Sequence, residues 1–173
     1  AASDVYKRQS LGNSVDFGNL SQDVSRPAGM ASDQVRGMHA GGDTVPGTRQ
    51  ITQIDYVVMA QQGNAVDFGD QTGVLEGGGT CASTTRGVLA GGGNIQRMDY
   101  VTIMTTGNTQ DFGDLSAAVN NATGLSNSTR GVFKIGFGSP LSYTNALEYI
   151  TITTLGNTID FGDALNVGPS TAT

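Results

Sequence analysis

Residues 63–70 read Gly-Asn-Ala-Val-Asp-Phe-Gly-Asp, and this stretch decides the fold because the chain repeats it three more times. The other copies begin with the glycines at 12, 107 and 156, so successive copies are spaced 51, 44 and 49 residues apart. Every copy keeps the Gly-Asn pair and the Asp-Phe-Gly triplet. A motif that recurs at nearly constant spacing indicates a repeat protein, in which each unit packs on its neighbours.

Two further patterns precede each later copy. The first is an acidic residue followed by Tyr and a run rich in β-branched residues, and the second is an Arg-Gly pair that opens an apolar run closing on glycines. The acidic-Tyr runs occupy residues 54–59, 98–103 and 147–152, and the Arg-Gly runs occupy residues 36–42, 86–93 and 130–138. Both have the composition of β-strands, and we expect the Gly-Asn pair to form a tight hairpin turn. With a strand of small residues upstream, each unit contains about four strands.

Composition agrees with a β-protein rich in turns. The 173 residues include 26 Gly, while 14% are charged and 6% are aromatic. The formal net charge of -6 and a pI near 4.4 disfavour nucleic-acid partners, which need clustered Lys and Arg. No apolar run approaches the roughly 20 residues of a membrane helix, so we expect no membrane insertion.

Four strands per unit and a period of roughly 40 to 50 residues are typical of β-propeller blades. The sequence therefore predicts an all-β fold of about three and a half four-stranded blades, as a fragment of a larger ring. The expected blades are residues 20–70, 71–114 and 115–163, with 10–19 ending an incomplete blade and 164–173 starting a further one.

The first nine residues call for a separate interpretation. Residues 4–9 read like the in-frame translation of an adapter used in sequencing libraries, so we interpret residues 1–9 as an artefact of sequencing and do not count them in a blade.

Three and a half blades do not readily close a ring, whose usual count is about 4 to 8. Uncovered apolar faces and strand edges invite association, so we expect further blades of the parent chain or another subunit to cover them. The isolated chain is then expected to form dimers or larger assemblies through its ends. The alternative is a strained four-blade ring in which residues 164–173 pack beside residues 10–19.

The apolar strand ending in glycines, the acidic-Tyr strand and the aromatic strand together resemble the kelch type of β-propeller repeat. Phe17, Phe68, Phe112 and Phe161 stand where kelch repeats usually carry Trp, and residues 134–138 depart from the double glycine. More narrowly, the repeats are similar to those of predicted tail-fibre and virion structural proteins of marine bacteriophages. That resemblance implies a virion or extracellular setting and does not imply a reaction.

Ten of the fifteen acidic residues fall at repeat positions, which favours structural over catalytic roles. A catalytic pair needs two carboxyls with unlike surroundings, whereas equivalent positions have similar ones. We expect these side chains to cap turns by accepting backbone N–H bonds. Asp67 and Asp70 lack the full spacing of a calcium loop, so we predict no metal and no cofactor. The ten are Asp16, Asp55, Asp67, Asp70, Asp99, Asp111, Asp114, Glu148, Asp160 and Asp163.

Arg36, Arg86 and Arg130 also recur in phase, and we expect each guanidinium to bridge a carboxylate within or between blades. The alternative is a ring of arginines that binds a ligand in a propeller funnel. Aromatic residues recur as well, and we expect the tyrosines at equivalent places and the last three phenylalanines packed between sheets. These aromatic positions are Phe17, Phe68, Phe112, Phe161, Tyr56, Tyr100 and Tyr149.

The remaining candidates for chemistry have structural interpretations. His39, the only histidine, takes the place of Leu89 and Phe133, so we expect a packed strand residue and not a base. Cys81 aligns with small or apolar residues and is expected to fill a core. The glycine clusters at 77–79 and 91–93 fit no nucleotide motif and are expected in loops and at strand ends.

The sequence thus predicts a non-enzymatic β-propeller part of a virion-associated or extracellular protein. Its loops are expected to recognise a host-surface glycan or protein. One alternative is a purely structural spacer in a phage fibre, and the other is a propeller enzyme whose active site lies in blades outside this sequence.

Overall fold

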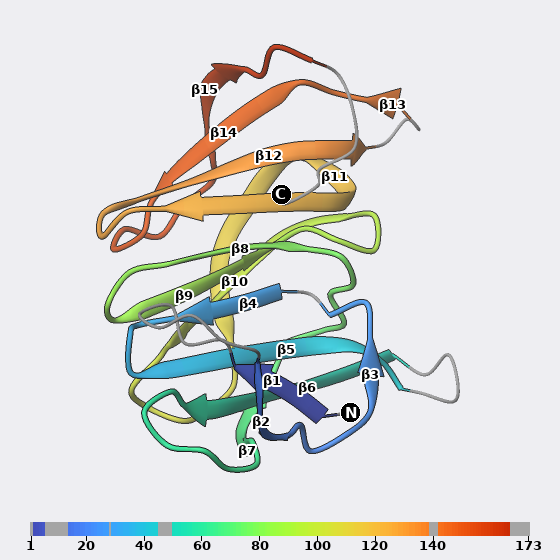
Figure 1. Ribbon diagram of the computed structural model, residues 1–173. Coiled ribbons are helices and arrows are strands. Elements are labelled where there is room, and N and C mark those ends of the chain that lie inside the picture. The colour runs from blue at the N-terminus through green and yellow to red at the C-terminus, as the bar shows by residue number, and fades with distance from the viewer. Residues whose placement is uncertain (1, 6–13, 28, 45–49, 139–141, 167–173) are drawn as a thin grey trace.

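The computed structural model describes residues 2–5, 14–27, 29–44, 50–138 and 142–166 (Figure 1). Within these ranges the protein is all-β, with antiparallel strands and no helix. The strands are β1 (Ala2–Val5), β2 (Val15–Asn19), β3 (Val24–Ser25), β4 (Gly29–Ser32), β5 (Arg36–Thr44), β6 (Gln50–Val58), β7 (Val66–Asp70), β8 (Gly79–Ala82), β9 (Arg86–Ala90), β10 (Ile95–Thr102), β11 (Gln110–Ser126), β12 (Arg130–Gly138), β13 (Ser142–Tyr143), β14 (Ala146–Thr151) and β15 (Ile159–Asp163).

These strands form three sheets in which sequence neighbours are mostly also neighbours in space. β1 and β2 form a pair, and β3-β5-β6-β7 form a second sheet in which β4 also pairs with β5. The third sheet has the order β15-β14-β12-β11-β10-β9-β8, with β13 paired to β12. Short connections favour such meanders because each strand can pair with the one that precedes it.

Each sequence repeat folds as a four-stranded meander, which we call a unit, with strands a to d in chain order. Unit 1 comprises β4 to β7, and unit 2 comprises β8, β9, β10 and the first part of β11. Unit 3 comprises the rest of β11 with β12, β14 and β15. β2 is strand d of a partial unit, with β1 paired to it in the place of strand c. Figure 1 shows the long β11 crossing from unit 2 to unit 3.

A β-bulge recurs between strands c and d of each unit. In unit 1, Asp55 pairs with Asp67 and Ile54 pairs with Gly69, which leaves Phe68 as an extra residue on strand d. Units 2 and 3 have the same shift at the same place. A bulge bends the strand and redirects side chains locally. The Asp-Phe-Gly triplet therefore encodes a bulge with the phenylalanine at its centre.

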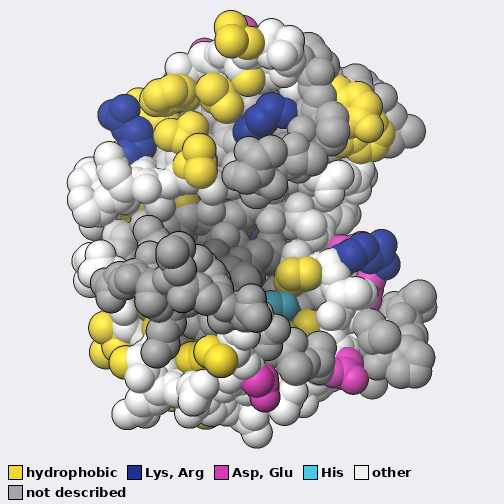
Figure 2. All heavy atoms as spheres, in the orientation of Figure 1, with side chains coloured by type: hydrophobic (Ala, Val, Ile, Leu, Met, Phe, Trp, Pro, Cys, Tyr) yellow, Lys and Arg dark blue, Asp and Glu magenta, His cyan; other side chains and the backbone are white. Residues whose placement is uncertain are grey.

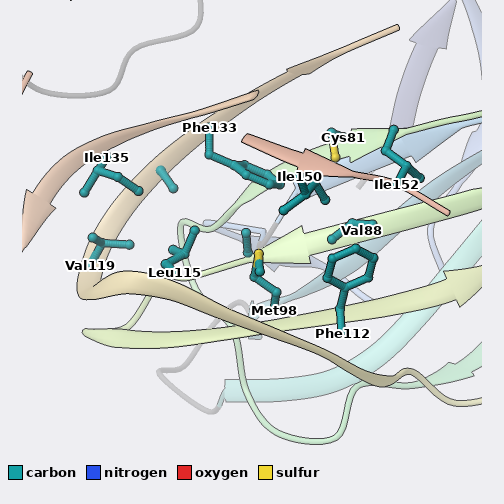
Figure 3. Packing of buried hydrophobic residues seen from close by; sticks show 12 residues of the cluster. Cys81, Val88, Met98, Phe112, Leu115, Val119, Phe133, Ile135, Ile150 and Ile152 are labelled. Atoms are coloured by element: carbon teal, nitrogen blue, oxygen red, sulfur yellow. The ribbon is translucent and has the colours of Figure 1, made fainter. Parts of the chain in front are cut away.

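The core lies between the units, in two layers. Side chains from units 1 and 2 form one cluster with Leu75: Met38, Ala40, Ile54, Phe68, Leu89, Val101 and Ile103. Side chains from units 2 and 3 form the other, drawn in Figure 3: Cys81, Val88, Ala90, Met98, Phe112, Leu115, Val119, Ala122, Phe133, Ile135, Ile150 and Ile152. Because successive residues of a strand point to opposite faces, β9 sends Val88 to one cluster and Leu89 to the other.

The described strands form an open stack and do not close into a ring. β1 and β2 lie beside unit 1, while β15 lies at the far end, at the top of Figure 1. Phe161 is 50% exposed, whereas Phe68 and Phe112 are 3% and 2% exposed. The expectation that Phe161 packs between sheets is therefore wrong, because no described residues stack on the outer face of unit 3. The alternative contact between residues 164–173 and 10–19 falls largely outside the described residues.

Candidate functional site: the contacts between units and the exposed turns

Three hydrogen bonds join each unit to the next, and we call this set the clasp. Between units 1 and 2, Gly107 donates its N–H to the carbonyl of Phe68 at 2.8 Å, and Thr109 donates its N–H to the carbonyl of Asp70 at 2.8 Å. The side-chain oxygen of Asn108 accepts the N–H of Asp70 at 3.0 Å. The same three bonds join Gly63, Asn64 and Ala65 to Phe17 and Asn19, and join Gly156, Asn157 and Thr158 to Phe112 and Asp114.

The clasp explains the glycine of the Asp-Phe-Gly triplet. Gly69 has φ +145°, and a Cβ there would lie 2.5 Å from the carbonyl oxygen of Gly107, so only glycine allows the approach. The Gly-Asn pair belongs to a longer connection, at residues 59–65, 103–109 and 152–158. The expected tight hairpin turn at the Gly-Asn pair is therefore wrong. The Gly-Asn pair instead forms hydrogen bonds with strand d of the preceding unit.

A buried carboxylate from strand c also crosses each boundary. Asp99 is fully buried and accepts hydrogen bonds from Thr72 Oγ1, which lies two residues after strand d of the preceding unit, at 2.6 Å and from Arg97 Nε at 3.2 Å. Equivalent contacts join Ser21 to Asp55 and Ser116 to Glu148. The hydroxyl always lies four residues after the phenylalanine of the Asp-Phe-Gly triplet. Because a buried carboxylate is costly without partners, these residues hold the units together.

The recurring arginines stack on tyrosines and bridge no carboxylate of the described residues, so the expected arginine–carboxylate bridge is wrong there. In unit 2, the Arg86 guanidinium lies 4.3 Å from the centre of the Tyr100 ring, and that ring meets Phe112 edge-on at 6.1 Å. The other two stacks are Arg36, Tyr56 and Phe68, and Arg130, Tyr149 and Phe161. The guanidinium is attracted by the negative face of the ring. Salt bridges between described residues involve Arg26 and Arg97 instead.

Arg36 and Arg86 additionally connect one unit to the next. Nη1 of Arg36 donates to the carbonyl of Ile103 at 2.9 Å, and Nη1 of Arg86 donates to the carbonyl of Ile152 at 2.8 Å. Both acceptors directly follow strand c of the following unit. The guanidinium groups of Arg36 and Arg86 are therefore engaged between units.

The other acidic residues of the motif lie at the surface. Asp16, Asp67, Asp111 and Asp160 are exposed, and Asp160 accepts the N–H of Gly162 at 3.1 Å. Within the described ranges, no group of three His, Cys, Asp or Glu side chains is placed to hold a metal ion. These carboxylates thus make local contacts or face solvent.

Turn caps lie at positions that the sequence analysis missed, between strands a and b. Asp33 Oδ1 accepts the N–H groups of Val35 and Arg36 at 2.9 and 2.7 Å, and Ser83 and Asn127 cap the equivalent turns. A short polar residue three positions before each Arg-Gly pair was the available signal. The pattern escaped notice because the residue type differs in each unit.

His39 and Cys81 are packed strand residues. His39 lies on β5 opposite Asp55, and burial lowers the pKa of His39 from its ordinary value while the Asp55 charge opposes that shift. Cys81 lies in the core between units 2 and 3, and burial raises the pKa of its thiol to about 12. At neutral pH this thiol is protonated and therefore a poor nucleophile.

The turns between strands a and b line a shallow hollow along one side of the stack, at one end of the strands. Its volume is about 230 Å³, and six of its lining residues are Asp33, Gln34, Ser83, Thr84, Asn127 and Ser128. The lining offers hydroxyl, amide and carboxyl groups and no aromatic ring. Such a surface can exchange hydrogen bonds with a polar ligand.

Comparison with known proteins finds no matching family model and no matching curated protein. The part of the chain that the structure describes contains no helix long and apolar enough to span a membrane. Inferences about function therefore rest on the repeat contacts and the exposed turns.

Proposed function

We propose that this chain is a non-enzymatic repeat segment that acts as a structural spacer in a virion-associated or extracellular assembly. The observation that carries the proposal is the use of the repeated polar residues. Asn108 and Asp99, with their equivalents, make contacts between units, and so do Arg36 and Arg86. A spacer requires a boundary that can be repeated without change, and the clasp is such a boundary.

The units are proposed to be kelch-like propeller blades in an open arrangement or as part of a larger ring. Two features support this proposal: each unit is a four-stranded antiparallel meander, and strands a of successive units approach closely. A Cβ on Gly124 would lie 2.2 Å from the carbonyl oxygen of Thr80, so β8 and the second part of β11 are in contact. Inner strands that meet while whole sheets stack face to face are expected of blades.

Small-angle X-ray scattering tests the spacer role. Because buried apolar clusters join the units and salt does not screen apolar contacts, we expect the scattering profile of the full chain to be the same at about 0.1 M and 1 M salt. A rigid profile with no binding to arrayed glycans or to bacterial cells supports a spacer. A profile that expands with salt would show that the units move independently and would contradict the proposal.

Recognition of a host-surface glycan or protein is the second candidate, and the turn hollow favours it. Gln34 and Thr84 are exposed there on a rigid framework, which is how repeat proteins present binding residues. If this candidate is correct, the full chain binds an arrayed glycan or a cell-surface protein, and the double variant Gln34→Ala/Thr84→Ala loses binding at least tenfold. Gln96→Ala is the matched control, because Gln96 is exposed near the opposite end of the strands.

A further inference from the structure

Strand β15 has the main-chain groups to which the three hydrogen bonds of a clasp would form, and no described residue forms a clasp with them. Its residues Phe161–Asp163 repeat the order of Phe112–Asp114 on β11, which receives the Gly-Asn pair of unit 3. A Cβ on Gly113 would lie 2.4 Å from the carbonyl oxygen of Gly156. A Cβ on Gly162 would have no heavy atom within 4 Å. The edge of β15 thus repeats the sequence of the inner edges, and no described residue covers it.

The outer face of unit 3 exposes side chains that are covered at the inner boundaries. Phe161 is half exposed, and Leu125 is 73% exposed although Cys81 at the same position in unit 2 is buried. Arg130 is exposed, whereas Arg86 donates to a carbonyl of the following unit. Figure 2 shows several groups of hydrophobic side chains over the region where Figure 1 places β12 to β15. An apolar area, a guanidinium donor and a strand edge therefore occur together.

We propose that this face binds a further repeat unit, whose Gly-Asn pair closes a clasp on β15. The inference rests on the proposed spacer function and names the partner that binds the outer face of unit 3. The incoming unit donates a glycine N–H to the carbonyl of Phe161 and bonds the main chain of Asp163 through its Asn and the residue that follows. It also places a carbonyl at Arg130 and apolar side chains on Phe161 and Leu125.

One residue specifies which repeat unit fits. At each inner boundary a hydroxyl four residues after the phenylalanine bonds the carboxylate of the next unit, as Thr72 bonds Asp99. Unit 3 has Leu165 at this position, and its side chain is fully exposed. A carboxylate buried against leucine would lose its hydroxyl partner, which is unfavourable. The partner unit therefore carries an apolar residue in place of the acidic one.

Because the partner unit must carry an apolar residue at the position opposite Leu165, the partner is not a second copy of this chain. The corresponding residues of units 1 to 3 are Asp55, Asp99 and Glu148, and all three are acidic. None of the units described here suits Leu165 without a change. The outer end is therefore selective for a unit of different sequence.

Extension of the full chain tests the proposal. A copy of residues 119–163 is appended after Val167 in place of residues 168–173, which supplies all four strands of a unit and keeps the 49-residue interval between the last two motifs, and the copy carries Glu148→Leu. Hydrogen exchange at the Asp163 amide is the readout, because the clasp asparagine would accept that N–H. We expect exchange at least tenfold slower than in the unextended chain. The slowing should disappear when the appended copy also carries Asn157→Ala.

Two further variants test the specificity and guard against a copy that does not fold. The extension with Glu148 unchanged should protect the Asp163 amide less, and Leu165→Ser in that chain should restore protection, because Ser116 partners Glu148 at the inner boundary. Slow exchange within the appended strands reports that the copy has folded. A folded copy that leaves Asp163 exchange unchanged overturns the docking site, and equal protection with Glu148 and with Glu148→Leu overturns the specificity. If the Glu148→Leu copy alone fails to fold while the Leu165→Ser pair docks, the specificity is also wrong.

The outcome can be separated from that of the spacer proposal. Docking can fail while scattering still shows a rigid stack, in which case the spacer role stands and its outer end has another use. A scattering profile that expands with salt would contradict the spacer even if the appended unit docks.

Discussion

Residues at equivalent repeat positions do not have equal effects on stability, because the neighbouring unit decides what each contacts. Gly113 and Gly162 occupy the same place in strand d and both have positive φ, +142° and +127°. Only Gly113 faces a carbonyl of the next unit. Comparing the stability of variants at such paired positions shows how much of the loss comes from the backbone conformation and how much from the close approach in the clasp.

Gly113→Ala is therefore expected to destabilise the protein more than Gly162→Ala. Both variants place a side chain at positive φ, which costs about 1 to 3 kcal/mol, but only Gly113→Ala also displaces the Gly156 carbonyl. We expect a further loss of at least about 1 kcal/mol in Gly113→Ala. Urea unfolding of the two variants measures the difference. Equal losses would mean that the clasp adds no packing constraint.

The stability of the fold should depend on the protonation of His39. Burial lowers the pKa of His39 in the folded protein, so the unfolded chain binds the proton more readily as pH falls through about 6.5. This contribution to stability is fully present above that pH and decreases as pH falls toward the lower folded pKa. The free energy of unfolding should therefore decrease between pH 8 and 5.5. His39→Leu, which copies Leu89 of unit 2, should remove that part of the decrease, and an unchanged slope would argue against it.

At the scale of the element, strand d has two roles that depend on its place in the stack. In β11 the bulged Phe112 fills the core between units 2 and 3, while in β15 the equivalent Phe161 is half exposed. The Arg, Tyr and Phe stack forms in both units, so the strand's internal geometry is the same. The difference is the presence of a covering unit.

Phe112→Ala should destabilise the protein by about 3 to 5 kcal/mol, as expected for a buried aromatic residue. Phe161→Ala should cost less than about half of that, because much of the ring is already exposed to water. Thermal unfolding followed by circular dichroism gives both values. Similar losses in the two variants would indicate that another part of the protein covers Phe161 in solution.

At the scale of the whole molecule, the protein behaves as a stack in which neighbouring units share cores and clasps. Few contacts of the described residues skip a unit, so we expect stability to be a sum of unit and boundary contributions. A local defect should then open the nearest boundary first.

Cys81 can report this opening because it lies in the core between units 2 and 3. Its thiol reacts with an alkylating reagent only when that boundary separates and the pKa falls from about 12 toward its ordinary value. Asn157→Ala removes a clasp bond at this boundary and should accelerate labelling roughly fivefold to tenfold at pH 8. Asn64→Ala makes the same change at the boundary with β2 and should leave the rate nearly unchanged. Equal acceleration would mean that the stack opens as one cooperative body.

The sequence alone determined the repeat, its strands and its all-β class. The Gly-Asn pair, the Asp-Phe-Gly triplet and the Arg-Gly pair are local patterns that mark where the strands begin and end, and local patterns select strands. Packed roles for His39 and Cys81 also followed from aligning the units. Each of these inferences needed only comparison of the chain with itself.

Only the tertiary structure decided what the repeated polar residues contact. Arg86 stacks on Tyr100 and Asp99 bonds Thr72, although charge complementarity had suggested that arginines and carboxylates would meet. Phe161 has the same local sequence as Phe112 and a different exposure. Contacts between units depend on how whole sheets stack, and residue spacing within one unit does not contain that information. For this reason the strands could be predicted from the sequence, while the clasp and its unfilled copy on β15 could not.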